Sequence, residues 1–480
     1  MHGITLTSGP SDWEIIQQEK GKATVELAGT YKVHPAAIEV GVASATPVVR
    51  VMREDDNTTV IPWTPAVQVT QGENFTGSFQ TEIVIPAGGL YRIETSLETR
   101  STLPNLTWLY RGDCVLHVGV GNLFLIAGQS NSAGYGKDYC TDPPHLCVHL
   151  FRNRNQWDLA SHPMNESTAA GSLPNEEMGI PGVSPYLSFG KKYYELTGMP
   201  VGLIKTAQGG SSIERWNPKD GDLYGNMMNK IRETKGRYAG VLWYQGCEDT
   251  RPEQAEAYGE HFRELAEALR AALGYEIPFF TMQLNRFING PFDEAWGMVR
   301  EAQRRAALSI PAVSVLPTTN LSQSDSVHNS AQANVALGIR LARQCACVLN
   351  GAEEFEAPAF DGAVIAEQEE KERLGLQGTW LRITFAHVKN CFMLYSANGR
   401  DSGFTLEDSA GPVEIKSIRA NREDKNRVYL ELDREPGEAA VLSFAWEADP
   451  VKLPMVDEVT YMPPLSFYRI SLEQTGGERR

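Results

Sequence analysis

Hydrophobic and polar residues alternate over short stretches in the first 118 residues of the chain. Stretches 23–27, 48–52, 77–85 and 91–95 show this most clearly, and Gly, Pro, Asn and Asp separate them. Alternation with a period of two is typical of strands that bury one face. Short strands at regular spacing with turn residues between them favour a sandwich of two sheets. We therefore predict an N-terminal β-sandwich domain over residues 1–118.

The pattern changes near Gly119. Apolar runs of strand length then alternate with stretches such as 262–273, in which apolar residues recur at spacings of three and four. This order predicts parallel β-α-β units, with helices packed on a buried sheet. The predicted domain spans residues 119–352, and its strand candidates are 123–127, 201–206, 240–244, 278–284 and 312–316.

Strand-like stretches return after Gly351, at 380–385, 391–395, 427–432 and 440–445. They predict a β-rich C-terminal domain over residues 353–480. Neither junction contains a long linker rich in Gly, Ser or Pro, so we expect both flanking domains to pack on the central one.

The net charge and hydropathy of the chain exclude some classes of binding partner. The formal net charge of −16 repels phosphate groups, so we expect neither nucleic acid nor a membrane surface as a partner. No apolar run approaches the roughly 18 to 20 residues of a membrane span, and the first residues lack a leader's basic and apolar character. We predict a cytoplasmic protein, or a secreted one if a leader has been removed. The oligomeric state stays open.

The chain has seven cysteines, an odd number that argues against a disulfide framework. Only Cys140 and Cys147, which flank Pro143 and Pro144, stand where a pair could form. Because cytosolic cysteines are usually reduced, we expect free thiols there.

The first strand candidate of the central domain is followed directly by Gly128-Gln129-Ser130-Asn131. Reactive groups of open α/β sheets gather just beyond the carboxyl ends of the strands. A serine at this place can present its hydroxyl and its own N–H to a substrate carbonyl. A polar turn without function is the alternative.

Two further strand candidates end in residues that can donate hydrogen bonds. Gly209 and Gly210 follow the second, and glycine lets a backbone N–H approach a developing oxyanion. Gln245 follows the third and can offer a side-chain amide. A glycine-rich turn and a polar cap are the corresponding alternatives.

Asp325 and His328 lie three residues apart beyond the fifth strand candidate. A carboxylate at this spacing can accept the imidazole Nδ1–H and leave Nε2 free to act as a base. Asp142 and His145 have the same spacing, but two prolines hold that segment extended, so we favour the first pair.

The order and spacing of these blocks resemble the SGNH hydrolases, and within them the branch of sialate O-acetylesterase-like and acetylxylan-esterase-related enzymes. The matching residues are Ser130; Gly209, Gly210 and Trp216; Trp243, Tyr244, Gln245 and Gly246; and Asp325 with His328. The resemblance implies a flavodoxin-like parallel sheet with helices on both faces. The chain departs from the family at Cys247, where Glu is usual, and at Asn329, where Pro is frequent. Both departures put the surroundings of Gln245 and His328 in doubt.

The resemblance implies a serine esterase that hydrolyses acetyl esters on sugars through an acetyl-enzyme. Ser130 is then the nucleophile, His328 the base and Asp325 its partner, while the N–H groups of Ser130 and Gly209 or Gly210 hold the oxyanion together with Gln245. No cofactor is required. His117, His149, His162 and Cys247 show no ligand spacing, so no metal site is expected.

The identity of the sugar depends on residues around the predicted catalytic residues. Trp216, Trp243 and Tyr244 could stack on a pyranose, although core packing is the more common role of such residues. Sialic acid would require a cation for its carboxylate, for which Arg152, Arg154 and Arg215 are candidates. A neutral plant polysaccharide such as acetylxylan would require none. A non-catalytic carbohydrate-binding protein and a lipase or thioesterase are the alternative functions.

Overall fold

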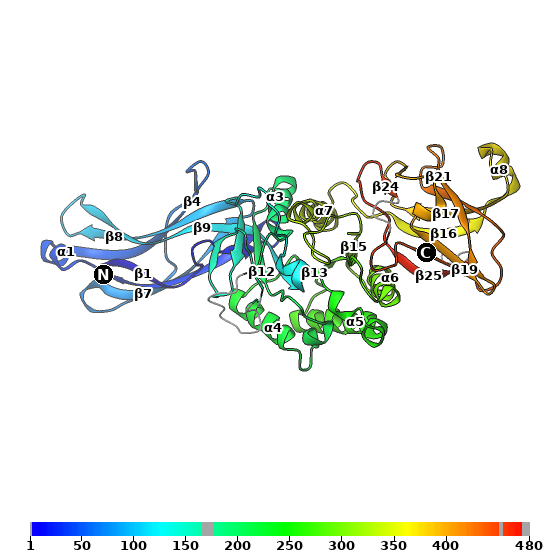
Figure 1. Ribbon diagram of the computed structural model, residues 1–480. Coiled ribbons are helices and arrows are strands. Elements are labelled where there is room, and N and C mark those ends of the chain that lie inside the picture. The colour runs from blue at the N-terminus through cyan, green and yellow to red at the C-terminus, as the bar shows by residue number, and fades with distance from the viewer. Residues whose placement is uncertain (1, 166–176, 178, 451–454, 473–480) are drawn as a thin grey trace.

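The computed structural model describes residues 2–165, 177, 179–450 and 455–472. Figure 1 shows them in three parts along the length of the molecule, with a helix-covered sheet between two groups of β-strands. No helix among these residues is long and apolar enough to cross a membrane.

The N-terminal part consists of antiparallel strands that alternate between buried and exposed side chains. In β3, Ala23, Val25 and Leu27 are buried and the residues between them are exposed. One sheet has the order β1-β3-β7-β6, and β4 pairs with β5 and β8 in another. Apolar residues of both sheets form a common core. The elements are β1 (Gly3–Ser8), β2 (Ile15–Gln17), β3 (Lys22–Lys32), α1 (Pro35–Val40), β4 (Val42–Arg53), β5 (Thr59–Pro65), β6 (Gln68–Gln71), η1 (Glu73–Phe75), β7 (Thr76–Pro86) and β8 (Gly89–Ser101).

A single long strand, β9 (Thr107–Gly128), joins the N-terminal part to the central sheet. Its first half pairs antiparallel with β8, and its second half lies parallel between β12 (Val201–Lys205) and β13 (Gly240–Tyr244). The domain boundary predicted at residue 118 therefore falls inside one strand. Burial changes at that residue, because alternation gives way to an unbroken buried run from Val118 onward.

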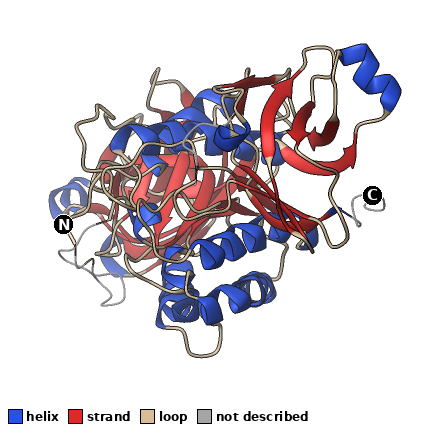
Figure 2. Ribbon diagram, turned by 45° about the vertical axis from the view of Figure 1, so that its right-hand side comes forward, coloured by secondary structure: helices blue, strands red, loops and turns tan. Residues whose placement is uncertain are grey.

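The central sheet has the order β11-β10-β12-β9-β13-β14-β15, and each neighbouring pair is parallel except β10 with β11. Helices α4, α5 and α6 contribute to the apolar core on one face, and α3 and α7 to the core on the other. Figure 2 shows helices on both sides of the central strands. The predicted α/β fold is thus confirmed. The elements are α2 (Ser130–Ala133), β10 (Val148–Phe151), β11 (Trp157–Leu159), α3 (Tyr186–Thr197), η3 (Ile213–Trp216), α4 (Asp222–Thr234), η4 (Cys247–Asp249), α5 (Pro252–Leu273), β14 (Phe279–Met282), α6 (Asp293–Ser309), β15 (Val313–Leu316) and α7 (Ala331–Asn350).

The C-terminal part is β-rich, as the sequence predicts, and forms sheets of order β16-β17-β22-β21, β20-β19-β23-β25 and β18-β24. Their apolar faces share one core. The elements are β16 (Ala359–Ile365), α8 (Gln368–Leu374), β17 (Thr379–Ala386), β18 (Phe392–Leu394), η5 (Gly399–Asp401), β19 (Phe404–Asp408), β20 (Gly411–Val413), β21 (Ile415–Ala420), β22 (Arg427–Leu432), β23 (Val441–Phe444), β24 (Met455–Asp457) and β25 (Phe467–Ser471).

Arg300 of α6 fastens the C-terminal part to the central sheet. Its side chain is fully buried, and burial lowers its pKa to about 9, so it stays charged at neutral pH. The guanidinium donates hydrogen bonds to backbone carbonyl oxygens on both sides of the junction, namely those of Leu284, Asn285, Ala445, Trp446 and Glu447. Such a buried cation is stable only because several acceptors surround it.

We expect Arg300→Ala to lower the free energy of unfolding by about 3–5 kcal/mol, because the buried carbonyl groups lose their donor and a cavity remains. Arg305→Ala on the exposed side of the same helix is the matched control, with an expected change within about 0.5 kcal/mol. Urea denaturation followed by circular dichroism measures both. Equal stabilities of the two variants would contradict the role assigned to Arg300.

Candidate active site

Ser130 stands at the carboxyl end of β9 and begins the short helix α2. The strand ends at Gly128 with a φ of 123°, and a Cβ there would lie 2.3 Å from the carbonyl oxygen of Tyr244. Only glycine therefore lets the ends of β9 and β13 approach this closely. Close approach of the strand ends brings the turns that follow them into one place.

His328 connects Ser130 to Asp325. The His328 Nε2 lies 2.9 Å from the Ser130 Oγ, and its Nδ1 lies 2.8 Å from the Asp325 Oδ2. Because a carboxylate only accepts, Nδ1 carries the proton and Nε2 accepts from the serine hydroxyl. Burial alone would raise the pKa of Asp325, but hydrogen bonds from the Val327 N–H and His328 hold it below its usual range. The three residues have the geometry of a nucleophile, its base and the group that orients the base.

Asn131 holds the loop of His328 against Ser130. Its side-chain amide donates to the carbonyl oxygen of Val327 at 3.1 Å, and its Oδ1 accepts from the Asn329 N–H at 2.9 Å. A proline at position 329 could not supply this N–H. The departure from the resembled family at Asn329 therefore adds a contact that fixes His328.

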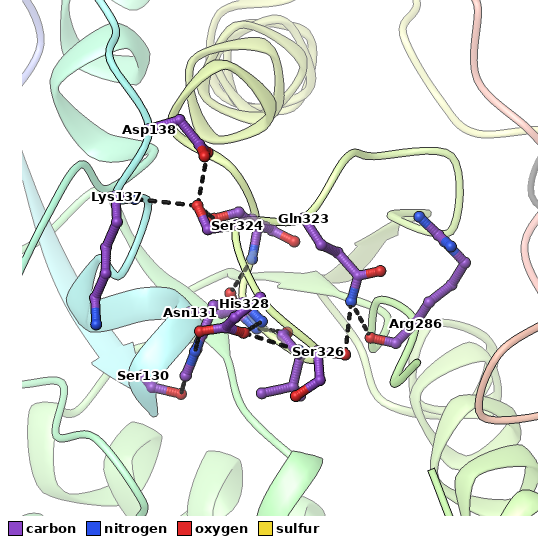
Figure 3. A network of polar contacts seen from close by, with 12 residues as sticks. Ser130, Asn131, Lys137, Asp138, Arg286, Gln323, Ser324, Ser326 and His328 are labelled. Atoms are coloured by element: carbon purple, nitrogen blue, oxygen red, sulfur yellow. Dashed lines mark hydrogen bonds and ion pairs between the residues drawn. The ribbon is translucent and has the colours of Figure 1, made fainter. Parts of the chain in front are cut away.

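A second set of contacts holds the outer side of the loop (Figure 3). Gln323 donates to the carbonyl oxygens of Arg286 at 2.6 Å and Ser326 at 3.0 Å. Ser324 donates to Asp138 at 2.7 Å and accepts from the Lys137 N–H at 3.0 Å. The loop is thus hydrogen-bonded both to the segment after β14 and to the segment after α2.

In the structure, two of the predicted oxyanion donors donate hydrogen bonds to acceptors within the protein. The Gly209 N–H donates to the Glu177 carboxylate, with distances of 3.1 and 3.3 Å to its two oxygens. The Gln245 amide donates to Asp249 and, at 3.0 Å, to the carbonyl oxygen of Ser211. Gly210 has a φ of 63° and open space beside its Cα. Among the described residues, no acceptor binds the N–H of Ser130 or Gly210, so these two N–H groups are available to an oxyanion.

The turn after β13 is built around Gln129 and Asp249. The Gln129 Oε1 accepts from the N–H groups of Gly246 at 2.9 Å and Glu248 at 3.3 Å. Asp249 accepts from the Ile213 N–H at 3.0 Å, and burial raises its pKa to about 6. Burial likewise raises the pKa of Cys247 to about 12, so its thiol is protonated at neutral pH. The residue that replaces the usual Glu is therefore an unreactive packing group.

The structure does not support the predicted aromatic platform. Trp216 has no exposed surface, and Trp243 and Tyr244 are each 1 % exposed. The two indoles pack edge to face with centroids 5.2 Å apart, in the core beneath the sheet, and Tyr244 lies in the core on the other face. A sugar cannot stack on rings that are covered on both faces.

The candidate arginines for an anionic sugar are already paired. Arg152 is 8 % exposed and donates to Asp158 at 3.0 Å, and Arg154 lies 3.4 Å from the same carboxylate. Arg215 donates to Asp222 with distances of 3.0 and 2.6 Å. The burial of Arg152 excludes it from contact with a substrate. Arg215 would have to leave its partner in order to bind one.

The rival pair of Asp142 and His145 does not form. Asp142 is paired with His162 at 2.9 Å and with Lys191, whereas the His145 ring accepts from the Cys147 N–H. All seven cysteines, Cys140 and Cys147 among them, are free thiols. Among the described residues, no group of three or more His, Cys, Asp or Glu side chains is placed to hold a metal ion.

Comparison with known proteins finds a matching family for the central part of the chain. Residues 120–347 match the family described as carbohydrate esterase, sialic acid-specific acetylesterase. No curated protein matches the chain.

One of the solved structures that the chain resembles shares its fold over nearly the whole length. A carbohydrate acetylesterase from Xanthomonas citri is 18 % identical over 97 % of this chain and 99 % of its own, with a TM-score of 0.60. A protein from Arabidopsis thaliana is 25 % identical over 48 % of this chain and 99 % of its own, with a TM-score of 0.42. The structure of NanS is 16 % identical over 48 % of this chain and 97 % of its own, with a TM-score of 0.39. The first of these shows that the three-part architecture occurs elsewhere.

The raised pKa of Asp249 predicts a pH dependence of stability. Its carboxyl titrates near 6 in the folded protein and near 3.8 in the unfolded chain, so the folded state binds the proton more tightly. The protonated Asp249 carboxyl therefore contributes fully to the stability of the fold below pH 4, and this contribution is lost as the pH rises through 6. At about 1.4 kcal/mol per pKa unit, the stability of wild type relative to Asp249→Asn should fall by roughly 2–3 kcal/mol between pH 4 and pH 7. Denaturation at both pH values measures it, and a constant difference would contradict the assignment.

Proposed function

We propose that the protein is a serine esterase that removes acetyl groups from a sugar, because residues 120–347 match the family described as carbohydrate esterase, sialic acid-specific acetylesterase. The observation that carries this proposal is the continuous hydrogen-bonded chain from Ser130 through His328 to Asp325. This arrangement supports acyl transfer without a cofactor.

In the first half of the reaction, His328 Nε2 takes the proton from Ser130 while the serine oxygen attacks the acetyl carbonyl. The carbonyl π electrons move onto its oxygen, which the N–H groups of Ser130 and Gly210 stabilise. The intermediate collapses when the sugar alcohol leaves with the proton from His328. The product of this half is an acetyl ester on Ser130.

In the second half, His328 takes a proton from a water molecule that attacks the acetyl-enzyme. Acetic acid then leaves as the proton on His328 returns to Ser130, and the acid ionises in solution. Asp325 remains ionised and stabilises the imidazolium that forms twice in each cycle. Its lowered pKa favours this ionised state.

O-acetylated sialic acid is the substrate that we propose, on the ground of the family match alone. The arginines considered for its carboxylate are engaged within the protein, so their pairing gives sialic acid no additional support. Acetylated xylan is therefore the substrate to compare directly with it.

We expect Ser130→Ala to lower acetate release from O-acetylated sialic acid, acetylated xylan oligomers and an aryl acetate by at least about 1,000-fold, because the nucleophile is removed. Ser132→Ala is the matched control, since the Ser132 hydroxyl donates to the carbonyl oxygen of Ala127 and not to the site. Its rate should stay within about threefold of wild type. No release by wild type from any of these esters would refute the esterase proposal and favour a carbohydrate-binding protein.

Asp325→Asn should lower kcat/KM by about 1,000- to 10,000-fold with little change in stability, because an amide no longer holds the Nδ1–H tautomer of His328. Steady-state kinetics on the aryl acetate measures the loss. A decrease of less than about tenfold would show that Asp325 does not orient the base.

A further inference from the structure

The carboxylate of Glu177 lies between the turn after β12 and the residues that follow α2. It is 3 % exposed and accepts hydrogen bonds from the Gly209 N–H, from the Tyr135 hydroxyl at 2.6 Å and from the side-chain amide of Asn165. A Cβ on Gly209 would lie 2.2 Å from the Glu177 Oε1, so only glycine permits this approach. Burial of a carboxylate is costly unless donors surround it, and here three donors do so.

Tyr135 links this carboxylate to His328. The two rings are stacked with centroids 4.8 Å apart and an angle of 22° between their planes. Burial, together with the hydrogen bond to Glu177, raises the pKa of the Tyr135 hydroxyl, which therefore stays protonated and keeps donating. The tyrosine ring is thus held at its hydroxyl end by Glu177 while its face covers the imidazole.

The stack opposes a motion of the His328 ring that its hydrogen bond to Asp325 permits. Asp325 fixes Nδ1, but the imidazole can still tilt about that hydrogen bond and move Nε2 away from the Ser130 Oγ. A ring packed on one face opposes this tilt. The electron-rich face of tyrosine also favours the imidazolium that forms when His328 takes a proton.

We propose that Glu177 and Tyr135 are positioning residues for the acyl-transfer reaction, which rests on the esterase function proposed above. Glu177 holds the Tyr135 ring on His328 and at the same time fixes the Gly209 turn. Gly209 then belongs to the support of the oxyanion hole, and its neighbour Gly210 supplies the N–H that the oxyanion meets.

The kinetics of Glu177→Ala, Glu177→Gln, Tyr135→Ala and Tyr135→Phe on an aryl acetate test this proposal. Both alanine variants should lower kcat by about 10- to 100-fold and leave KM within about threefold, because the reacting groups are displaced while the small substrate still binds. Glu177→Gln should recover most of kcat, since its amide oxygen can still accept from Gly209 and Tyr135. Tyr135→Phe, which keeps the stacked ring, should lose less than Tyr135→Ala.

Tyr429→Phe is the matched control. The Tyr429 hydroxyl also lies within hydrogen-bond distance of carboxylates, those of Glu370 at 2.8 Å and Asp424 at 2.9 Å, but in the C-terminal part. This variant should lower the melting temperature without lowering kcat. If the losses of kcat in the Glu177 and Tyr135 variants merely follow their melting temperatures, as a structural role requires, the proposal fails. An increase of kcat in Glu177→Ala also overturns it, because the carboxylate would then be blocking the Gly209 N–H.

A measurement without turnover separates this proposal from the esterase function. The ¹⁵N signals of the His328 ring, assigned with a His328→Gln variant, report its tautomer and order even if wild type hydrolyses no ester. Glu177→Ala should shift or broaden these signals, and Glu177→Gln should restore them. Unchanged signals in Glu177→Ala would overturn the positioning role, whatever the activity of the wild type.

Discussion

The bonds of Asn131 to the loop of His328 are the constraint on which the candidate site depends. Ser130 and His328 are 198 positions apart in the chain, and their side chains must meet to within a hydrogen bond. Asn131 follows Ser130 directly and binds the backbone on both sides of His328, through Val327 and Asn329. The nucleophile and its base are thereby held by the same short segment, so a shift of one carries the other with it.

The surrounding fold makes this junction possible. The parallel order of β12, β9 and β13 brings the turns after three strands to one edge of the sheet, and Gly128 lets two of those strand ends approach closely. The C-terminal part supports the same edge from outside, because Arg300 binds the segment after β14 as well as the segment after β23. The site is therefore supported from the sheet and from the following domain.

The sequence predicts the parts of this molecule that local pattern governs. Buried runs such as 123–127 and the Asp325–His328 spacing require only neighbouring residues to be recognised. The short strands β10 and β11 are not predicted, because runs of four and three residues carry little periodicity. The burial of Trp216 and the pairing of Arg152 depend on how the elements pack together, which the local sequence pattern does not show. Glu177 has no local signal, since its contact with Gly209 joins residues 32 positions apart.

In the proposed mechanism, Ser130 carries the acetyl group during turnover. The most direct test is mass spectrometry of peptides from the enzyme, acid-quenched within milliseconds of mixing with an excess of aryl acetate. We expect one acetyl group on the peptide that contains Ser130, which appears before free acetate accumulates and decays as the substrate is consumed. Acetate release with no acetylated Ser130, or with the acetyl group on another residue, would contradict it.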